Sequence, residues 1–428
     1  MSRARLGWGA AITAALVLGC GGSRIAIEPA GNPAAGFAES ADPALAADSA
    51  TGDLLLAFVA RGADSTWRLY FSRSTDGGAT WSPARVVTEQ PGEVKPHGEA
   101  SARLVTAPDG RVALVWSQDF KVEGRKWPAS RIRFSRSLDG GATWSPAVTL
   151  NDDTTAADAP RGHTFHGAAG DGKGGIAVAW LDERKGGDVT HDHAGGHQHD
   201  ATAESDATIY LARSDDFGAT WSGNRPLWGA VCPCCRVTLA TRPGGAIAAT
   251  WRKHYPGDVR DVVTAELPDA GDARLPEPER VHEDGWVFPG CPHTGPALSI
   301  GEDGTRHVAW YTGRPGGAGV FLAREGAHGG AGAPVALVQD STLPTAHAAV
   351  LALPDGGTLA AWDIGSRGAR GIQVARVAAG ATRVRAESVP GSEAGSHPQL
   401  ARTATGSVLL AFTRIAGAGA VVELVRVR

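Results

Sequence analysis

The sequence predicts an all-β protein built from many short strands, and three observations support this fold class. An eight-residue turn motif occurs three times, and a sixteen-residue hairpin pattern starts at seven places along the chain. The 58 glycines and 26 prolines return at regular intervals. Such contents would otherwise suggest disorder, but their regular spacing favours tight turns between short strands.

The turn motif follows the pattern Ser-x-Asp-x-Gly-x-Thr-Trp and spans residues 74–81, 137–144 and 214–221. In a hairpin turn, the Asp carboxylate can accept turn N–H groups that the strand ladder leaves unpaired. The glycine permits backbone angles that a larger residue resists, and the Trp buries a large ring under the turn. Three copies are typical of a propeller, but they do not by themselves indicate catalysis.

The hairpin pattern combines a short apolar strand, a glycine-containing turn and a second strand that ends near Trp or Phe. The seven hairpins start at Pro43, Ser101, Phe165, Arg236, Gly295, His347 and His397. The last unit has room for only three strands, and residues 25–27 could supply its fourth, which would close a ring without exposed sheet edges. We therefore expect residues 25–428 to form a β-propeller of four-stranded blades, with seven blades preferred and six as the alternative.

The turn motif resembles the Asp box, or BNR repeat, of the sialidase (neuraminidase) superfamily, whose sialidases have six blades. The resemblance implies a sialidase-like exo-glycosidase or a glycan-binding protein. A sialidase needs three arginines on the substrate carboxylate, a Tyr nucleophile paired with Glu, and an Asp acid/base. Under this alternative the candidate catalytic residues are Glu99, Tyr255, Tyr311 and Arg236. The arginines near the expected pocket are Arg103, Arg161, Arg236, Arg252, Arg260 and Arg314, but the early Arg-Ile-Pro motif of the family is missing.

The N-terminus reads as a targeting segment. Basic residues precede an apolar run over residues 6–18 that is too short to span a bilayer comfortably. Residues 17–20, Val-Leu-Gly-Cys, resemble a bacterial lipobox, so we expect a signal peptide at 1–19 and a lipidated tether at 20–24 that starts with Cys20. The alternative is an ordinary secretory signal. The expected location is the periplasmic side of the outer membrane. A net charge of −4 gives no indication of nucleic acid as a partner, and we expect a monomer.

Histidines and cysteines gather just before and at the hairpin starts, where the innermost strands of a propeller approach its axis. The candidate metal ligands are His97, His163, His166, Cys232, Cys234, Cys235, Cys291, His293, His347 and His397. Clustered imidazoles and thiolates predict copper or zinc as the bound metal, and an exported location favours copper. Charged residues just past the second strands, such as Asp182 and Arg252, are interpreted as a solvated rim.

The four cysteines after Cys20 allow a second interpretation. Cys232 and Cys291 hold equivalent positions in adjacent blades, so a disulfide could join them in an oxidising compartment. Cys234 and Cys235 would then form a vicinal disulfide or act as ligands. Under this interpretation the histidines line a carbohydrate or small-molecule pocket. The Cys-Pro-Cys-Cys-Arg stretch, with its partner loop at 290–296, resembles a subgroup of periplasmic sialidase-like lipoproteins.

A histidine-rich insertion lies in the third blade and contains His191, His193, His197 and His199. It could capture metal ions and pass them inward, or it could be a solvated insertion with incidental metal affinity. The leading hypothesis is a metal-binding propeller lipoprotein of the cell envelope that acts in metal capture, transfer or redox chemistry. The sequence does not decide whether the protein is an enzyme; as one, it would be a sialidase-like glycoside hydrolase or a copper-dependent oxidoreductase.

Overall fold

A computed structural model describes residues 25–123, 128–153, 161–184, 207–272, 274–326, 332–365, 371–417 and 419–428. The predicted signal peptide, the tether with Cys20 and the histidine-rich insertion lie outside these residues. Within the described part of the chain, no helix has the length and apolar character needed to cross a membrane.

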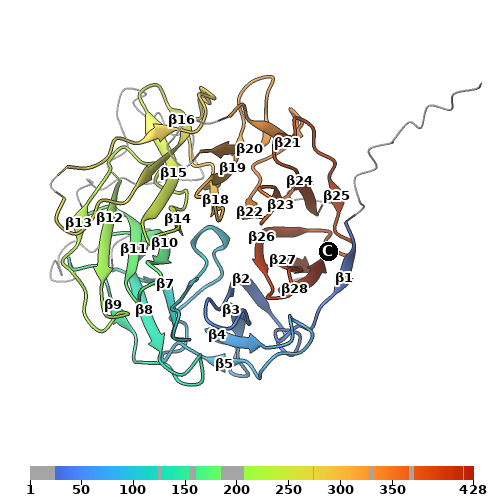
Figure 1. The fold of residues 1–428 in the computed structure, drawn as a ribbon. Coiled ribbons are helices and arrows are strands. Elements are labelled where there is room, and N and C mark those ends of the chain that lie inside the picture. The colour runs from blue at the N-terminus through green and yellow to red at the C-terminus, as the bar shows by residue number, and fades with distance from the viewer. Residues whose placement is uncertain are drawn as a thin grey trace, which may run out of the picture.

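The described strands form seven four-stranded antiparallel sheets arranged as blades around a central axis (Figure 1). Blade 1 contains β2 (Ser40–Ala47), β3 (Leu54–Arg61), β4 (Trp67–Ser74) and β5 (Arg85–Val86). Blade 2 contains β6 (Arg103–Thr106), β7 (Val112–Phe120), β8 (Ala129–Ser137) and β9 (Val148–Thr149). Blade 3 contains β10 (His163–Gly170), β11 (Ile176–Asp182), β12 (Thr208–Ser214) and β13 (Arg225–Pro226).

Blade 4 contains β14 (Thr238–Thr241), β15 (Ile247–Tyr255), β16 (Val259–Glu266) and β17 (Glu279–Arg280). Blade 5 contains β18 (Ala297–Ile300), β19 (Arg306–Thr312), β20 (Gly319–Glu325) and β21 (Val335–Gln339). Blade 6 contains β22 (Ala348–Ala352), β23 (Thr358–Asp363), β24 (Ile372–Val377) and β25 (Glu387–Ser388). Blade 7 contains β26 (Gly395–Arg402), β27 (Val408–Ala416), β28 (Gly419–Val427) and β1 (Ile27–Pro29). A single 3-10 turn, η1 (Gly98–Ala100), is the one helical element in the described ranges.

The N-terminal strand closes the ring. Strand β1 pairs antiparallel with β28, with Ile27 opposite Val427 and Pro29 opposite Val425. Ala26 and Arg428 add two backbone hydrogen bonds of 3.0 and 2.9 Å beyond this register. The predicted closure by the N-terminal segment is therefore confirmed, with the strand two residues further along than expected. The preference for seven blades is confirmed, and the six-blade alternative is wrong.

The core consists of apolar layers between neighbouring blades. In every blade a large aromatic side chain on the second strand packs into the cluster shared with the preceding blade. These aromatic residues are Phe58, Trp116, Trp180, Trp251, Trp310, Trp362 and Phe412, and each is at most 2% exposed. Burying one such ring removes about 150–250 Å² from water, which contributes roughly 4–6 kcal/mol. The Trp or Phe at the end of each predicted hairpin therefore holds adjacent blades together.

The three Asp boxes form hairpin turns between the third and fourth strands of blades 1, 2 and 3. In the first, the carboxylate of Asp76 accepts hydrogen bonds from the backbone N–H groups of Ala79 and Thr80 at 3.0 and 2.9 Å. The Thr80 hydroxyl donates to the same carboxylate at 2.6 Å. The turn glycines have positive φ, as at Gly141 with 96°. These contacts confirm the role predicted for the Asp side chain.

Gly141 also packs against the neighbouring blade, so a substitution there tests the packing between blades. A Cβ atom added there would lie 2.0 Å from the ring of Phe71, whereas a Cβ at Gly110, with a similar φ of 83°, meets nothing within 4 Å. We expect Gly110→Ala to cost about 1 kcal/mol of unfolding free energy, for its backbone strain alone. Gly141→Ala should cost roughly 1–3 kcal/mol more, because a ring must move. Chemical denaturation of both variants measures the difference, and equal losses would contradict the packing.

Candidate functional site

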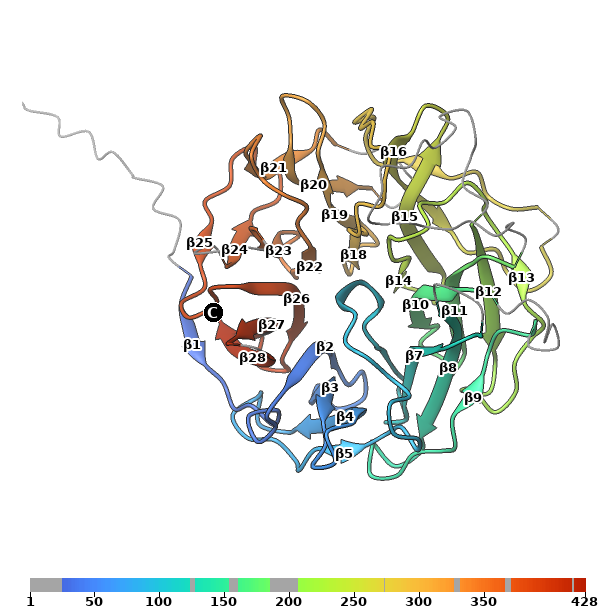
Figure 2. The same ribbon diagram turned by 180° about the vertical axis from the view of Figure 1, so that it is seen from behind.

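Side chains from several blades meet where the innermost strands begin. The loop between β5 and β6, which carries η1, reaches into the centre of the ring (Figure 2). A Cβ atom at Gly98 in this loop would lie 2.4 Å from the ring of His397, which belongs to blade 7. The loop from blade 1 to blade 2 therefore reaches the axial end of blade 7, which is the neighbour of blade 1 in the closed ring.

Irregular strand starts help to aim side chains toward this axial region. The register shifts between Ala41 and Ala44, between Thr164 and Gly167, and between Ser396 and Gln399. In each shift one residue other than glycine has a positive φ: Asp42 at 54°, Phe165 at 53° and His397 at 52°. Such backbone strain costs on the order of 1–3 kcal/mol and is concentrated at functional sites. His293, with φ of 47°, has the same strain at the start of blade 5.

Glu99 connects three blades across the axis. Its side chain is only 2% exposed and accepts a hydrogen bond of 2.9 Å from the Arg236 guanidinium and one of 2.9 Å from the backbone N–H of Gly295. The Nε2 atom of His347 lies 3.7 Å from the same carboxylate. Arg236 also donates to the carbonyl of Ala348 at 3.2 Å. The axial region therefore has a buried ion pair at its centre.

His347 is held as a cation. Its Nδ1 lies 2.8 Å from Asp363 Oδ2, and its Nε2 lies 2.9 Å from the carbonyl oxygen of His293. Both partners can only accept, so both ring nitrogens must carry hydrogen and neither keeps a lone pair for a metal. Burial would lower the pKa of His347, but the charge and hydrogen bond of Asp363 raise it above its usual value.

His397 stacks on His347 with 3.7 Å between the ring centroids. Burial and the adjacent His347 cation hold the pKa of His397 well below its usual value, so this imidazole stays neutral. The axial pair therefore consists of one cationic and one neutral ring. Although Glu99, His347 and His397 have ligand atoms within 4.8 Å of one another, the proton on His347 Nε2 occupies the place of a metal bond.

His163 belongs to a separate group between blades 2 and 3. Its Nδ1 lies 2.8 Å from the carbonyl of Ser130, and its Nε2 lies 2.9 Å from Asp153 and 3.5 Å from Asp182. Both nitrogens again meet acceptors, so this ring is an imidazolium too. Burial lowers its pKa, but Asp153 and Asp182 raise it to a net value above the usual one. Arg184 donates to Asp182 at 2.8 Å and completes the network.

The other axial histidines do not share one ligand position. His166 is fully buried, and its Nε2 lies 3.1 Å from the carbonyl of Val115. The backbone N–H of His97 donates to the Asp42 carboxylate. The centroid of the His97 ring lies 5.4 Å from that of Phe165 and 6.4 Å from that of His293. Burial raises the pKa of Asp42 to about 6. The structure thus divides the predicted His/Cys set into groups instead of one axial cavity.

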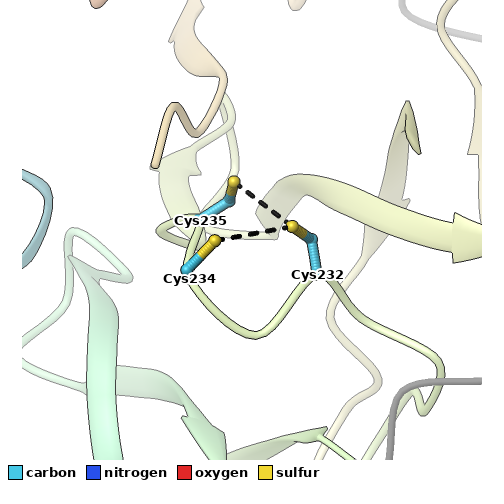
Figure 3. A group of neighbouring side chains, drawn as sticks. All are labelled: Cys232, Cys234 and Cys235. Atoms are coloured by element: carbon cyan, nitrogen blue, oxygen red, sulfur yellow. Dashed lines mark hydrogen bonds between the residues drawn. The ribbon is translucent and has the colours of Figure 1, made fainter. Parts of the chain in front are cut away.

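The cysteines form the group with a soft donor set. Cys232 Sγ lies 3.4 Å from Cys235 Sγ and 3.9 Å from Cys234 Sγ, in the loop between β13 and β14 (Figure 3). Cys291, from the loop between β17 and β18 that leads into blade 5, packs against the cluster that contains Cys234 and interacts with Cys234 electrostatically. All four are free thiols. The predicted Cys232–Cys291 disulfide is therefore not the arrangement in the structure, because Cys291 contacts Cys234 instead.

Two buried arginines make the cysteine group electropositive. The Arg260 guanidinium donates to Cys232 Sγ at 3.3 Å. Arg252 is 1% exposed, and its guanidinium donates to the carbonyls of Thr294, Arg260 and Tyr311. None of these described contacts neutralises the charge of Arg252. Burial would raise the pKa of Cys232, but hydrogen bonding with Cys234 and Cys235 and the charges of the two arginines lower it well below its usual value.

The sulfur spacing fits a bound metal. With a metal–sulfur distance of about 2.3 Å, two ligands of a tetrahedral ion stand about 3.8 Å apart. The distances of 3.4 and 3.9 Å lie on either side of this value. Cys232, Cys234 and Cys235 have sulfurs within 4.8 Å of one another and are buried. The lowered pKa of Cys232 beside Arg260 favours the thiolate that a metal requires, whereas burial and the neighbouring Cys232 raise the pKa values of Cys234 and Cys235, so metal binding would have to displace their protons.

The residues considered for glycoside hydrolysis are only partly brought together. Glu99 and Arg236 meet at the axis, and burial together with Arg236 lowers the pKa of nearby Arg103 to about 10. Tyr311 donates its hydroxyl to the carbonyl of Leu343 at 2.9 Å. The ring of Tyr255 lies 4.0 Å from the Arg280 guanidinium. In the described contacts, neither tyrosine pairs with a glutamate.

Sequence reasoning misjudged the burial of some residues of these groups and overlooked another. Asp182 and Arg252 are 0% and 1% exposed, so their interpretation as a solvated rim is wrong. Asp363 was not considered, although it follows the buried Trp362 much as Asp182 follows Trp180. A charged residue one or two positions after the buried Trp of the second strand is the sequence signal that Asp182, Arg252 and Asp363 share. Arg260 was considered only as a carboxylate ligand, whereas it contacts a thiol.

No protein-family model matches the chain, and no curated protein matches it. Solved structures share its fold. A polysaccharide lyase of family PL25, an ulvan lyase, has a TM-score of 0.53 at 11% identity and covers 91% of this chain and 94% of its own. The Hadza microbial sialidase Hz136 has a TM-score of 0.48 at 15% identity, covering 85% of this chain and 72% of its own. A protein of unknown function from Dyadobacter fermentans has a TM-score of 0.45 at 16% identity, covering 94% and 98%. At 11% identity, the likeness to the lyase is a likeness of fold alone.

The buried neutral His166 predicts sensitivity to acid. Burial, with the charge of Arg103, lowers its pKa to about 3. Below about pH 6.5 the His166 side chain is protonated in the unfolded chain but stays neutral in the folded one. Its contribution therefore lowers the free energy of unfolding as pH falls, by about 2 kcal/mol between pH 7 and 5. Denaturant unfolding at both pH values should show a flatter pH dependence for His166→Gln. His163, whose pKa is raised, contributes stability that is lost as pH rises, so His163→Gln should make the acid loss steeper. Identical slopes in all three proteins would contradict this assignment.

The Glu99–Arg236 pair predicts a large stability contribution. Replacing Glu99 by Gln leaves a buried guanidinium without its counterion, which costs about 3–5 kcal/mol. Glu302, whose side chain is 78% exposed and 3.5 Å from Arg402, is the matched control. Glu302→Gln should change the unfolding free energy by less than about 1 kcal/mol. Similar losses in both variants, measured by guanidinium denaturation, would show that Glu99 does not hold the axis together.

Proposed function

We propose that this chain is a metal-binding propeller lipoprotein of the bacterial cell envelope that holds copper or zinc for capture, transfer or redox chemistry. The metal site is the thiol group of Cys232, Cys234 and Cys235, with Cys291 beside it. The observation that carries the proposal is the convergence of three buried sulfurs within 4.8 Å beside the buried guanidiniums of Arg252 and Arg260.

The thiols are favoured over His163 and His347 as ligands because both ring nitrogens of these histidines already donate hydrogen bonds. His163 and His347 have acceptors on both ring nitrogens, so binding a metal there would break a hydrogen bond to a carboxylate. The cysteine sulfurs instead face one another and a positive charge. Arg260 also lies 3.5 Å from Asp258, but the described contacts of Arg252 are with backbone carbonyls only. A buried positive charge without a carboxylate partner is costly, and a metal–thiolate group with net negative charge would offset that cost for Arg252.

The predicted lipid on Cys20 would hold the protein at a membrane, in our proposal on the periplasmic side of the outer membrane. The insertion with His191, His193, His197 and His199 lies outside the described residues. Its place in the chain, directly after β11 of blade 3, supports a role in capturing metal.

A sialidase-like exo-glycosidase or glycan-binding protein is the second candidate. The buried Glu99–Arg236 pair favours it, with Arg103 and the strained Asp42 beside the same axial region. A carboxylate and arginines at a propeller axis suit a polar ligand such as a glycan. The alternative lacks the paired tyrosine that the sialidase resemblance implies, since Tyr311 donates to a backbone carbonyl.

Elemental analysis of untagged protein, reduced and purified without oxygen, tests the proposal. We expect one equivalent of copper or zinc in the wild type. Removing a residue that only hydrogen-bonds to a metal ligand costs roughly 10–100-fold in metal affinity. Cys235→Ser removes a ligand itself, so its metal affinity should fall by more than that. His347→Gln is the matched control and should keep its metal. A wild type that takes up neither metal would refute the proposal, and release of product from a fluorogenic sialoside would support the second candidate.

A further inference from the structure

The four sulfurs lie in a row that runs inward. Cys291 is partly exposed, whereas Cys234, Cys232 and Cys235 are 4%, 0% and 1% exposed. Cys291 packs against the cluster that holds the other three and interacts with Cys234. The Sγ of Cys234 lies 3.9 Å from that of Cys232, which lies 3.4 Å from that of Cys235. The row therefore begins near solvent and ends in the apolar core between blades 3 and 4.

One of the four sulfurs, that of Cys291, stands apart from the other three. Cys232, Cys234 and Cys235 form a group of mutually close ligand atoms, and Cys291 is not part of it. The three come from one short loop of blade 4, while Cys291 comes from the loop that leads into blade 5 (Figure 3 shows the three). One loop therefore provides a three-sulfur site, and the neighbouring loop places a fourth thiol at its outer side.

We infer that the cysteines act in series: Cys291 is the exchange ligand through which a metal enters and leaves, and the other three hold it. This inference rests on the proposed metal-binding function. It also selects the metal class. Zinc in protein sites is almost always four-coordinate. A three-sulfur site with thiolate donors instead suits a soft monovalent cation, Cu(I).

Ligand exchange then needs no redox step. A Cu(I) ion arrives on a sulfur ligand of a carrier, and Cys291 Sγ forms a Cu–S bond while one Cu–S bond to the carrier breaks. The next exchange forms the bond to Cys234 Sγ, which is the neighbour of Cys291, and breaks one to the carrier. Copper remains Cu(I) throughout. Each proton that a cysteine thiol releases passes to the departing ligand or to water.

The burial of the inner three explains why an outer ligand is needed. Cys232 and Cys235 lie in the same apolar cluster as Trp228 and Trp251, and these rings stack with centroids 4.5 Å apart. A hydrated ion or a bulky carrier cannot reach these sulfurs without opening that layer. Cys291 is packed against the edge of the cluster and is only partly buried.

Two measurements on the full chain under anaerobic, reducing conditions test the inference. Competition with a chromogenic Cu(I) chelator gives the stoichiometry and affinity, and the rate at which the chelator removes copper gives the exchange rate. For Cys291→Ser we expect one bound copper, an affinity within about tenfold of the wild type, and removal that is slower by about tenfold or more. For Cys235→Ser, matched in chemistry but placed at the inner end, we expect the affinity itself to fall. Circular dichroism and thermal melting verify that both variants are folded.

The results separate this inference from the proposed function. If Cys291→Ser lowers the affinity as much as Cys235→Ser, the four thiols are equal ligands of one tetrahedral site. The metal-binding proposal then stands and the series arrangement is wrong. Unchanged removal kinetics in Cys291→Ser would also overturn it. If the wild type binds no Cu(I) but does bind zinc, the inference fails alone; if it binds neither metal, both fail.

Discussion

The pairing of β1 with β28 is the constraint on which the rest of the molecule depends, because it joins the start of the domain to its end. Glu99 meets Arg236 across 137 residues of chain and Gly295 across 196. Bringing such distant segments together has an entropic cost that no single contact can offset. The closed ring offsets it once for all blades, through the aromatic layers between them, and removes the sheet edges that an open array would expose.

Closure brings charged side chains into a confined region, and their pairing decides which chemistry is left available. Around the axis and between blades 2 and 3, carboxylates and carbonyls accept hydrogen bonds from the ring nitrogens of His347 and His163. These imidazoles stabilise the fold as cations and have no free lone pair. In blade 4 the balance is reversed, since Arg252 and Arg260 lie beside thiols. This positive surrounding lowers the pKa of Cys232, whereas burial raises those of Cys234 and Cys235.

The same region shows how residue type and residue role can differ. The positions of His and Cys residues at the hairpin starts suggested one axial metal cavity, but hydrogen-bond partners divide the histidines into separate groups. Conversely, charged residues after the second strands, such as Asp182 and Arg252, were expected in solvent and are buried. Asp182 is offset by Arg184 and the His163 ring, and Arg252 donates to three backbone carbonyls. Such compensation depends on neighbours from other blades, so it is invisible in the local sequence pattern.

Local patterns in the sequence were enough to predict the all-β class, the seven repeated hairpins, the Asp-box turns and the closing strand near Ile27. They succeed because strand alternation, turn chemistry and inter-blade aromatics act over a few residues and repeat. The equivalence of Cys232 with Cys291 in adjacent blades likewise correctly placed their loops near each other. Only the tertiary structure decided which sulfurs meet, that His163 and His347 are protonated, and that Arg252 is buried without a carboxylate. Distances of a few ångströms between blades determine these outcomes, and they follow from how the closed ring packs.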